Sequence, residues 1–296
     1  GGGYLGDTFG PLGDAGVSIQ PGEYLLAIDG KPVSETSTPD MLLVGKVNKR
    51  VVLTVNSKPT MEGARKVSVV PTAMDTNLRY GAWVDERIKR VNELSGGKIG
   101  YMHVPNTSQE GVVGFGKGWY SSADKQAMIV DERFNGGGMI PTFFIEKLTR
   151  QVQTMFRQRN GSDIAFPTFT VPGPKAMLIN AYAGSGGDHF PWLFRENRVG
   201  PVIGKRTWGG LVGITGSAPL IDGGFLTAPE FGLYDPRSGQ WIAENQGIAP
   251  DIDVDARPDL LAQGRDPQLE KAVEVLLKEL DSPRPAWKRP DFPKIK

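Results

Sequence analysis

The chain has 296 residues, enough for one large domain with a smaller one, and its 34 Lys and Arg against 33 Asp and Glu give a formal net charge of +1. This balance excludes the strong basic field of nucleic-acid-binding proteins, and no apolar run reaches the ~18–20 residues that span a bilayer, so we expect neither nucleic acid nor membrane as a partner. With no Cys and only two His, disulfides, thiol nucleophiles and most zinc centres are excluded, and we expect no metal and no other cofactor.

Residues 1–72 have the pattern of a small β-rich domain. Three strand-type runs bounded by turn residues cover residues 24–28, 50–55 and 65–70. A short helix is predicted between the first two runs, because Thr38 is a typical N-cap and Pro39 a typical first helical residue. The chain starts Gly1-Gly2-Gly3-Tyr4, without an initiator Met or an apolar leader, so we expect this domain to be incomplete.

Residues 73–282 alternate between strand-type and helix-type segments. Predicted strands cover residues 99–104, 127–131 and 175–180, and predicted helices cover residues 82–94, 141–152 and 186–197, with a further glycine-weakened helix after Ser108. Asp266 as cap and Pro267 as first residue mark the start of a last helix, and residues 283–296 follow as a tail. Such alternation is typical of parallel βαβ units, so the sequence predicts an α/β fold for this larger domain.

A run of three glycines, Gly136-Gly137-Gly138, directly follows a predicted buried strand. Residues without a Cβ let backbone N–H groups approach a ligand oxygen closely, so this run is a candidate oxyanion hole. A tight turn between strand and helix that needs positive φ explains the same glycines without any chemistry.

The second candidate is Ser185, which lies between a predicted strand and the start of a predicted helix, within Gly184-Ser185-Gly186-Gly187-Asp188. At that position its hydroxyl lies at the carboxyl edge of the sheet, beside free N–H groups and the positive end of the helix dipole. Ser185 is therefore a candidate nucleophile, although an ordinary N-cap serine fits the same pattern.

A third polar turn, Glu244-Asn245-Gln246-Gly247, follows a strand-like segment that ends at Ala243. The Glu244 carboxylate is suited to orienting a base or binding a substrate amine, but a Glu in a polar turn is usually only solvated. On its own this turn does not decide between the two.

A serine nucleophile needs a general base, and the sequence offers none that is obvious. His103 alternates with apolar residues in a predicted strand, which is typical of a structural histidine. His189 follows Ser185 by one helical turn and needs an unusual geometry to reach its hydroxyl.

Taken together, several motifs resemble the tricorn-type serine peptidases, which are related to the carboxy-terminal-processing proteases. The matching stretches are residues 100–105 (GYMHVP), 131–138 (DERFNGGG), 184–188 (GSGGD), 200–213 (GPVIGKRTWGGLVG), 244–251 (ENQGIAPD) and 266–269 (DPQL). Residues 1–6 (GGGYLG) and 22–30 (GEYLLAIDG) resemble the PDZ module that precedes this core in the family. The stretch before Asp14 is short for such a module, which predicts missing residues between Gly10 and Pro11.

This resemblance implies a PDZ-like domain at residues 1–72 and a crotonase/Clp-protease-like peptidase core at residues 73–282. It implies that Ser185 is the nucleophile, that the amides of Gly138 and Gly186 form the oxyanion hole, and that Glu244 is a supporting carboxylate. It also implies peptide substrates and a cytoplasmic homohexamer that acts downstream of the proteasome or a similar protease and passes products to aminopeptidases.

The family's catalytic His lies before the PDZ module, and nothing in this sequence matches it, so we expect the base to lie outside this segment. In the carboxy-terminal-processing proteases a Lys serves as base, but here Gly210 stands at that Lys position and Lys205 is five residues away. Three further departures are Gly186, where the family usually has Asp, Ala181, where it often has Glu, and Gln246, which replaces another common Glu.

These departures leave rival interpretations open. One is a non-catalytic, PDZ-bearing peptide-binding or assembly protein with a decayed peptidase core. Another is acyl-CoA chemistry, because crotonase-type folds use similar oxyanion glycines, although that chemistry does not need a serine at a strand–helix turn.

Overall fold

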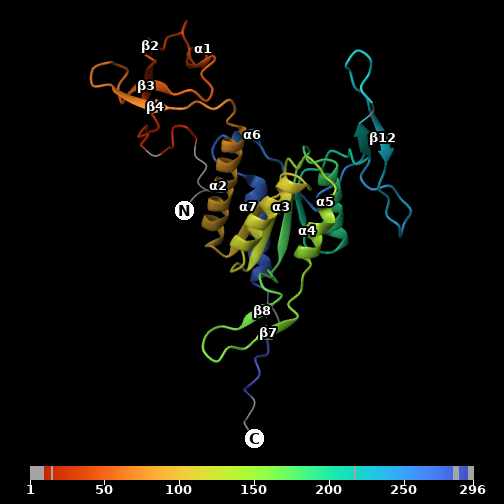
Figure 1. The fold of residues 1–296 in the computed structure, drawn as a ribbon. Helices are drawn as coiled ribbons and strands as arrows, with labels where there is room; N and C mark the ends of the chain where they lie inside the picture. Colours follow the sequence, from red (N-terminus) through yellow and green to blue (C-terminus); the bar gives the residue numbers. More distant parts are fainter. Residues whose placement is uncertain (1–9, 15, 217, 283–286, 293–296) are drawn as a thin grey trace. The chain divides into compact units, whose positions relative to one another are not determined.

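The structure, a computed structural model, describes residues 10–14, 16–216, 218–282 and 287–292. The chain divides into two compact units, Gly1–Glu86 and Arg87–Lys296, with helix α2 (Thr76–Ser95) containing the boundary (Figure 1). The GGGYLG stretch at residues 1–6 lies outside the described residues, as do residues 283–286 and 293–296 of the tail.

The first unit contains a four-stranded antiparallel sheet in the order β2-β1-β3-β4. The strands are β1 (Tyr24–Ile28), β2 (Lys31–Pro32), β3 (Val51–Asn56) and β4 (Arg65–Val69). Helix α1 (Pro39–Leu43) begins as predicted, because the Thr38 side chain accepts a hydrogen bond from the Met41 amide. A small core of Ile28, Val51, Leu53, Val55, Val67 and Val69 holds the sheet and helix together.

The second unit is built on a five-stranded parallel sheet in the order β13-β10-β9-β6-β5. These strands are β5 (Ile99–His103), β6 (Ala127–Asp131), β9 (Lys175–Ile179), β10 (Val202–Gly204) and β13 (Ile252–Asp253). The strands β5, β6 and β9 are mostly apolar and are buried along their whole length, as expected for a parallel sheet covered on both faces. The predicted α/β core after a β-rich domain is confirmed.

Helices cover both faces of this sheet (Figure 1). Helices α3 (Gln109–Ser121), α4 (Pro141–Leu148) and α5 (Gly186–Glu196) share one apolar cluster with the sheet, in which Phe115, Phe144 and Phe190 meet Met128 and Met177. Helix α7 (Pro267–Leu280) packs on strands β6, β9 and β10 from the other face. The Asp266 side chain caps it by accepting from the Leu269 amide, as the sequence predicts.

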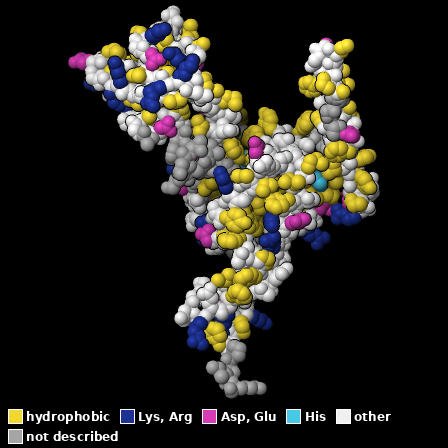
Figure 2. Space-filling view, viewed as in Figure 1, with side chains coloured by type: hydrophobic (Ala, Val, Ile, Leu, Met, Phe, Trp, Pro, Cys, Tyr) yellow, Lys and Arg dark blue, Asp and Glu magenta, His cyan; other side chains and the backbone are white. Residues whose placement is uncertain are grey.

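Two hairpins extend from the second unit (Figure 1). One pairs β7 (Thr154–Phe156) with β8 (Ile164–Phe166), and the other pairs β11 (Gly213–Gly216) with β12 (Thr227–Phe231). Figure 2 shows exposed apolar side chains on both, and Ile221 and Phe225 between β11 and β12 are among the most exposed. A short helix, α6 (Pro258–Leu261), precedes α7.

Three predicted elements differ from the structure. Helix α2 begins at Thr76, six residues before the predicted start at 82, and helix α4 ends at Leu148 instead of continuing to 152. The segment before Glu244 is not a strand, because only one isolated bridge joins Trp241 to Tyr234. Within the described part of the chain, no helix is both long enough and apolar enough to cross a membrane.

Candidate active site

Ser185 lies in a strained turn between strand β9 and helix α5. Its backbone has φ 57° and ψ −117°, and the Gly187 amide donates to the Gly184 carbonyl at 2.8 Å, which closes a β-turn with Ser185 at its second position. Positive φ is uncommon outside glycine and costs about 1–3 kcal/mol. Although Ser185 is the N-cap residue of α5, its side chain makes no capping hydrogen bond. The helix-capping explanation therefore fails, and the partly exposed hydroxyl is left for chemistry.

The glycine run after β6 packs directly against this turn. A Cβ on Gly137 would lie 2.7 Å from the Ser185 Cβ, so only glycine fits there. Asn135 joins the two loops: its side-chain oxygen accepts from the Gly137 amide at 2.9 Å, and its backbone carbonyl accepts from the Gly184 amide at 3.1 Å. The run is therefore more than a tight turn, because it is held at the candidate nucleophile.

Gly138 and Gly186, the two glycines that the resemblance assigns to an oxyanion hole, lie close to each other beside Ser185. A Cβ on Gly186 would lie 2.8 Å from the Gly138 nitrogen and 2.0 Å from the Thr107 hydroxyl oxygen. Within the described residues, neither glycine amide has a hydrogen-bond acceptor. Both glycines and Ser185 line one cavity of about 100 Å³. Two free N–H groups, of which that of Gly186 is at the N-terminus of α5, can stabilise negative charge that develops on a substrate oxygen.

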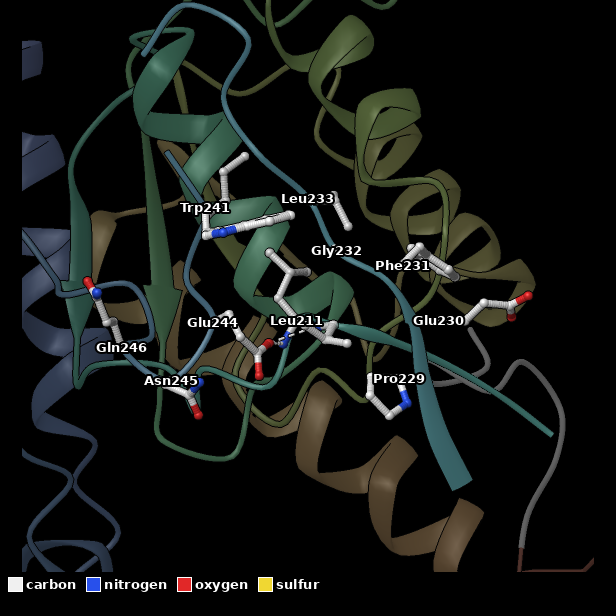
Figure 3. Close-up of a pocket in the computed structure, with 12 residues that line it drawn as sticks. Leu211, Pro229, Glu230, Phe231, Gly232, Leu233, Trp241, Glu244, Asn245 and Gln246 are labelled. Atoms are coloured by element: carbon white, nitrogen blue, oxygen red, sulfur yellow. Dashed lines mark hydrogen bonds between the residues drawn. The ribbon is translucent and has the colours of Figure 1, made fainter. Parts of the chain in front are cut away.

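Glu244 lies at the edge of a second, larger pocket of about 430 Å³ (Figure 3). One carboxylate oxygen accepts from the amides of Leu211 at 2.8 Å and Val212 at 2.7 Å. Leu211, Phe231 and Leu233 also line the Ser185 cavity, so the two pockets adjoin. Glu244 is half-buried and held in place by two backbone donors, and is not a freely solvated turn residue.

The sequence analysis missed Asp188 and Thr207, which lie between these two parts of the site. Asp188 is fully buried on α5, and its carboxylate accepts from the Thr207 hydroxyl and, at 2.8 Å, from the Gly209 amide. The Thr207 hydroxyl oxygen in turn accepts from the Ile248 amide at 2.7 Å. Burial raises the pKa of Asp188. The only signal in the sequence was the place of Asp188 in the same motif as Ser185.

Among the described residues, no candidate general base is hydrogen-bonded to the Ser185 hydroxyl. His103 is buried, with its Nε2 2.9 Å from the Arg133 carbonyl oxygen, and burial lowers its pKa. His189 lines the Ser185 cavity and its pKa is also lowered by burial, but no hydrogen bond joins it to Ser185 among the described residues. Lys205 pairs with Asp253 at 2.7 Å.

Comparison with known proteins agrees with this α/β core and its serine-centred strand–turn–helix site. The model of Peptidase family S41 matches residues 98–254, and the model of the Tricorn protease PDZ domain matches residues 4–74. The chain belongs to peptidase family S41, a family of serine peptidases, and it carries the PDZ domain of the tricorn type.

Its relatives are tricorn proteases. The chain is 36% identical over 287 residues to "Tricorn protease homolog 1" of Streptomyces coelicolor, covering 97% of this chain and 27% of that one. It is 36% identical over 260 residues to "Tricorn protease" of Thermoplasma volcanium, covering 88% of this chain and 25% of that one. The solved structure titled "Crystal structure of the tricorn protease" superposes with a TM-score of 0.85 at 34% identity, over 95% of this chain and 27% of the other.

The chain thus spans about a quarter to a third of the length of the curated relatives it matches. The family assignment favours a peptidase over the non-catalytic and acyl-CoA alternatives. The roles of the individual site residues rest on the geometry described above.

Proposed function

We propose that these residues are the PDZ and catalytic-core portion of a tricorn-like serine peptidase that hydrolyses peptides through an acyl-enzyme on Ser185. The observation that carries the proposal is the strained turn that presents an uncapped Ser185 hydroxyl beside the free amides of Gly138 and Gly186. Strained backbone held in place by its surroundings is characteristic of functional sites.

In the proposed reaction, the Ser185 oxygen attacks the carbonyl carbon of the peptide bond while a base removes its proton. The carbonyl oxygen becomes negatively charged and accepts hydrogen bonds from the Gly138 and Gly186 amides, each worth about 3 kcal/mol of transition-state stabilisation. The C–N bond then breaks, the leaving amine takes the proton, and an ester on Ser185 remains. Water hydrolyses this ester in the second half of the reaction.

The base comes from a segment of the complete protein outside these residues. His103 faces the Arg133 carbonyl and Lys205 is paired with Asp253, so neither is available for this role. Glu244 is fixed by two amides at the margin of an open pocket, where its second carboxylate oxygen can orient a base that enters from outside (Figure 3). Glu244 therefore acts through the base and not on the peptide.

The cavity beside Ser185 suits an apolar side chain at the cleavage site. Apart from the glycines, Ser185 and His189, its lining residues are Met139, Pro141, Leu211, Phe231 and Leu233. Burying an apolar side chain against such a lining contributes about 25 cal/mol per Å² of surface removed from water.

From the family resemblance we carry over the wider setting: a cytoplasmic homohexamer that degrades peptides released by the proteasome or a similar protease and passes its products to aminopeptidases. The names of the tricorn relatives support only the tricorn-type protease within this setting.

The test is peptide hydrolysis by the complete protein and its Ser185→Ala variant. We expect the variant to lose at least 1,000-fold in kcat, because the covalent route is closed. The matched control is Ser238→Ala, at an exposed serine whose hydroxyl donates to Asp235. Unchanged hydrolysis in Ser185→Ala would refute the proposal.

A further inference from the structure

Three large aromatic side chains are exposed where neighbouring strands of the parallel sheet end. Phe134 follows β6, Tyr182 follows β9 and Trp208 follows β10, and these strands are adjacent in the order β10-β9-β6. Their exposed fractions are 53%, 77% and 70%. Because the carboxyl ends of parallel strands share one edge of the sheet, the three rings lie along the same edge as Ser185.

Phe134 and Tyr182 are held as a stacked pair. Their ring centroids are 5.5 Å apart at an interplanar angle of 23°. One oxygen, Oδ1 of Asn180, accepts from both backbone amides, at 3.0 Å from Phe134 and 3.2 Å from Tyr182. Phe134 also has positive φ, 64°, which is a genuine outlier for a bulky residue. The Phe134 backbone is therefore strained in the conformation that presents this pair at the surface.

Trp208 lies in a slot formed by two glycines next to the candidate nucleophile. Its amide donates to the Ala183 carbonyl at 2.8 Å. A Cβ on Gly184 would lie 2.6 Å from an atom of the indole ring, and a Cβ on Gly210 would lie 2.3 Å from another. Gly184 directly precedes Ser185, so the indole is fixed against the residue before the candidate nucleophile while most of its surface remains exposed.

We propose that Phe134, Tyr182 and Trp208 form a subsite that binds an apolar or aromatic side chain of the peptide substrate near the cleaved bond. This inference rests on the proposed peptidase function. A peptide fits as the occupant because the rings continue directly from the Ser185 turn, and because aromatic faces bind apolar groups of a ligand by stacking and by surface burial. The subsite is separate from the Ser185 cavity, which none of the three rings lines.

Binding is measured on the complete protein with Ser185→Ala, so that no turnover occurs. The ligands are two series of otherwise identical peptides. One series carries Phe at each position in turn and the other carries Ala, and calorimetry measures the binding affinity of each peptide. We expect one position at which Phe binds about tenfold tighter than Ala, and we expect Tyr182→Ala and Trp208→Ala to reduce that preference to within twofold.

The matched control is Tyr120→Ala on helix α3, which removes another exposed tyrosine that contacts an aromatic residue, Phe169. This control should keep the preference, and the thermal unfolding midpoint of each variant shows whether it is folded. The proposal is overturned if no position prefers Phe, if all variants keep the preference, or if Tyr182→Ala instead changes the oligomeric state, which would make this edge an interface between copies.

The same series separates the inference from the proposed function. If the selective Phe position is found but protein with Ser185 intact cleaves no peptide, the subsite stands and the peptidase proposal fails. If peptides are cleaved without any selective position, the peptidase stands and the subsite is refuted.

Discussion

The carboxylate of Asp188 accepts a hydrogen bond from the hydroxyl of Thr207, and both side chains are buried. Asp188 is on the first turn of α5, whose N-cap is Ser185, and the Thr207 oxygen also accepts from the Ile248 amide just beyond the Glu244 turn. This short chain of hydrogen bonds therefore fixes the serine helix and the Glu244 segment relative to each other.

We expect Thr207→Val to weaken this connection. Valine keeps the volume but removes the hydroxyl donor to the Asp188 carboxylate, which keeps only the Gly209 amide of the two donors described above, and it leaves the buried Ile248 amide without an acceptor. The free energy of unfolding should fall by about 1–3 kcal/mol. The value of kcat should fall with little change in KM, because Ser185 and Glu244 are no longer held in their relative positions. Urea denaturation and steady-state kinetics measure the two effects. Thr207→Ser keeps the hydroxyl and should therefore retain most of the free energy of unfolding and most of kcat. Equal losses in Thr207→Val and Thr207→Ser would contradict the account.

Gly186→Ala should damage the proposed oxyanion hole. The new Cβ would lie 2.0 Å from the Thr107 hydroxyl oxygen and 2.4 Å from the Gly138 carbonyl oxygen, so the two amides must move apart. We expect kcat to fall by about 100-fold, the effect of losing one oxyanion donor. Thr107→Ala, Gly186→Ala should recover part of this loss, since it removes one of the two clashes. A kcat that is unaffected by Gly186→Ala would argue against Gly186 as a donor.

The elements that the sequence predicted well are those with a local cause. Thr38 and Asp266 predicted the starts of α1 and α7 because their caps involve residues only three positions away. Strand β6 was predicted with its observed bounds, because its four apolar residues form a short continuous run that ends at Asp131. In contrast, helix α4 ends at Leu148, four residues before its predicted end, and the two hairpins β7–β8 and β11–β12 were not predicted.

In the candidate site too, residues with a local sequence signature could be proposed from the sequence, whereas residues that meet only in the folded chain could not. Ser185 and the glycine run could be proposed from the sequence because a nucleophile turn and an amide-rich loop have local signatures. The family resemblance supplied the pairing of Gly138 with Gly186, and the structure shows them in contact. Thr207 and Asp188 were missed because they are 19 residues apart and their hydrogen bond exists only in the folded chain. Whether Ser185 was merely a helix cap could be decided only from its side-chain contacts.

Arg133 should be among the most destabilising positions to change. Its guanidinium is 2.6 Å from the Asp131 carboxylate and 3.0 Å from that of Asp266, and all three side chains are buried. Arg133→Leu would leave two buried carboxylates without this cation and should cost about 3–5 kcal/mol of unfolding free energy. The control is Arg237→Leu, which breaks exposed pairs with Asp235 and Glu196 and should cost less than about 1 kcal/mol. Denaturant unfolding that ranks the two variants equally would contradict this assignment.

Glu132 should make stability depend on pH. Burial raises its pKa well above 4.5, and the nearby carboxylates of Asp188 and Asp131 raise it further. The folded protein therefore keeps a proton that the unfolded chain releases, so stability falls as the pH rises above about 4.5, by up to about 1.4 kcal/mol per pH unit.

Glu132→Gln should remove this fall. The free energy of unfolding is measured in urea from pH 5 to 8. As the pH rises, the value for Glu132→Gln should increase relative to that of the unmodified protein. Glu146→Gln, at an exposed glutamate on α4, should follow the unmodified protein throughout. Parallel curves for Glu132→Gln and the unmodified protein would show that Glu132 does not hold the proton.

The central claim is that Ser185 is a nucleophile activated by a base from outside these residues. Labelling with a fluorophosphonate, followed by peptide mapping of the modified residue, tests it most directly when the complete protein and residues 1–296 are compared. The account predicts label on Ser185 in the complete protein and none in residues 1–296 alone. Label in both would place the base within these residues and return His103 or His189 to consideration, whereas a complete protein without label on Ser185 would contradict the claim.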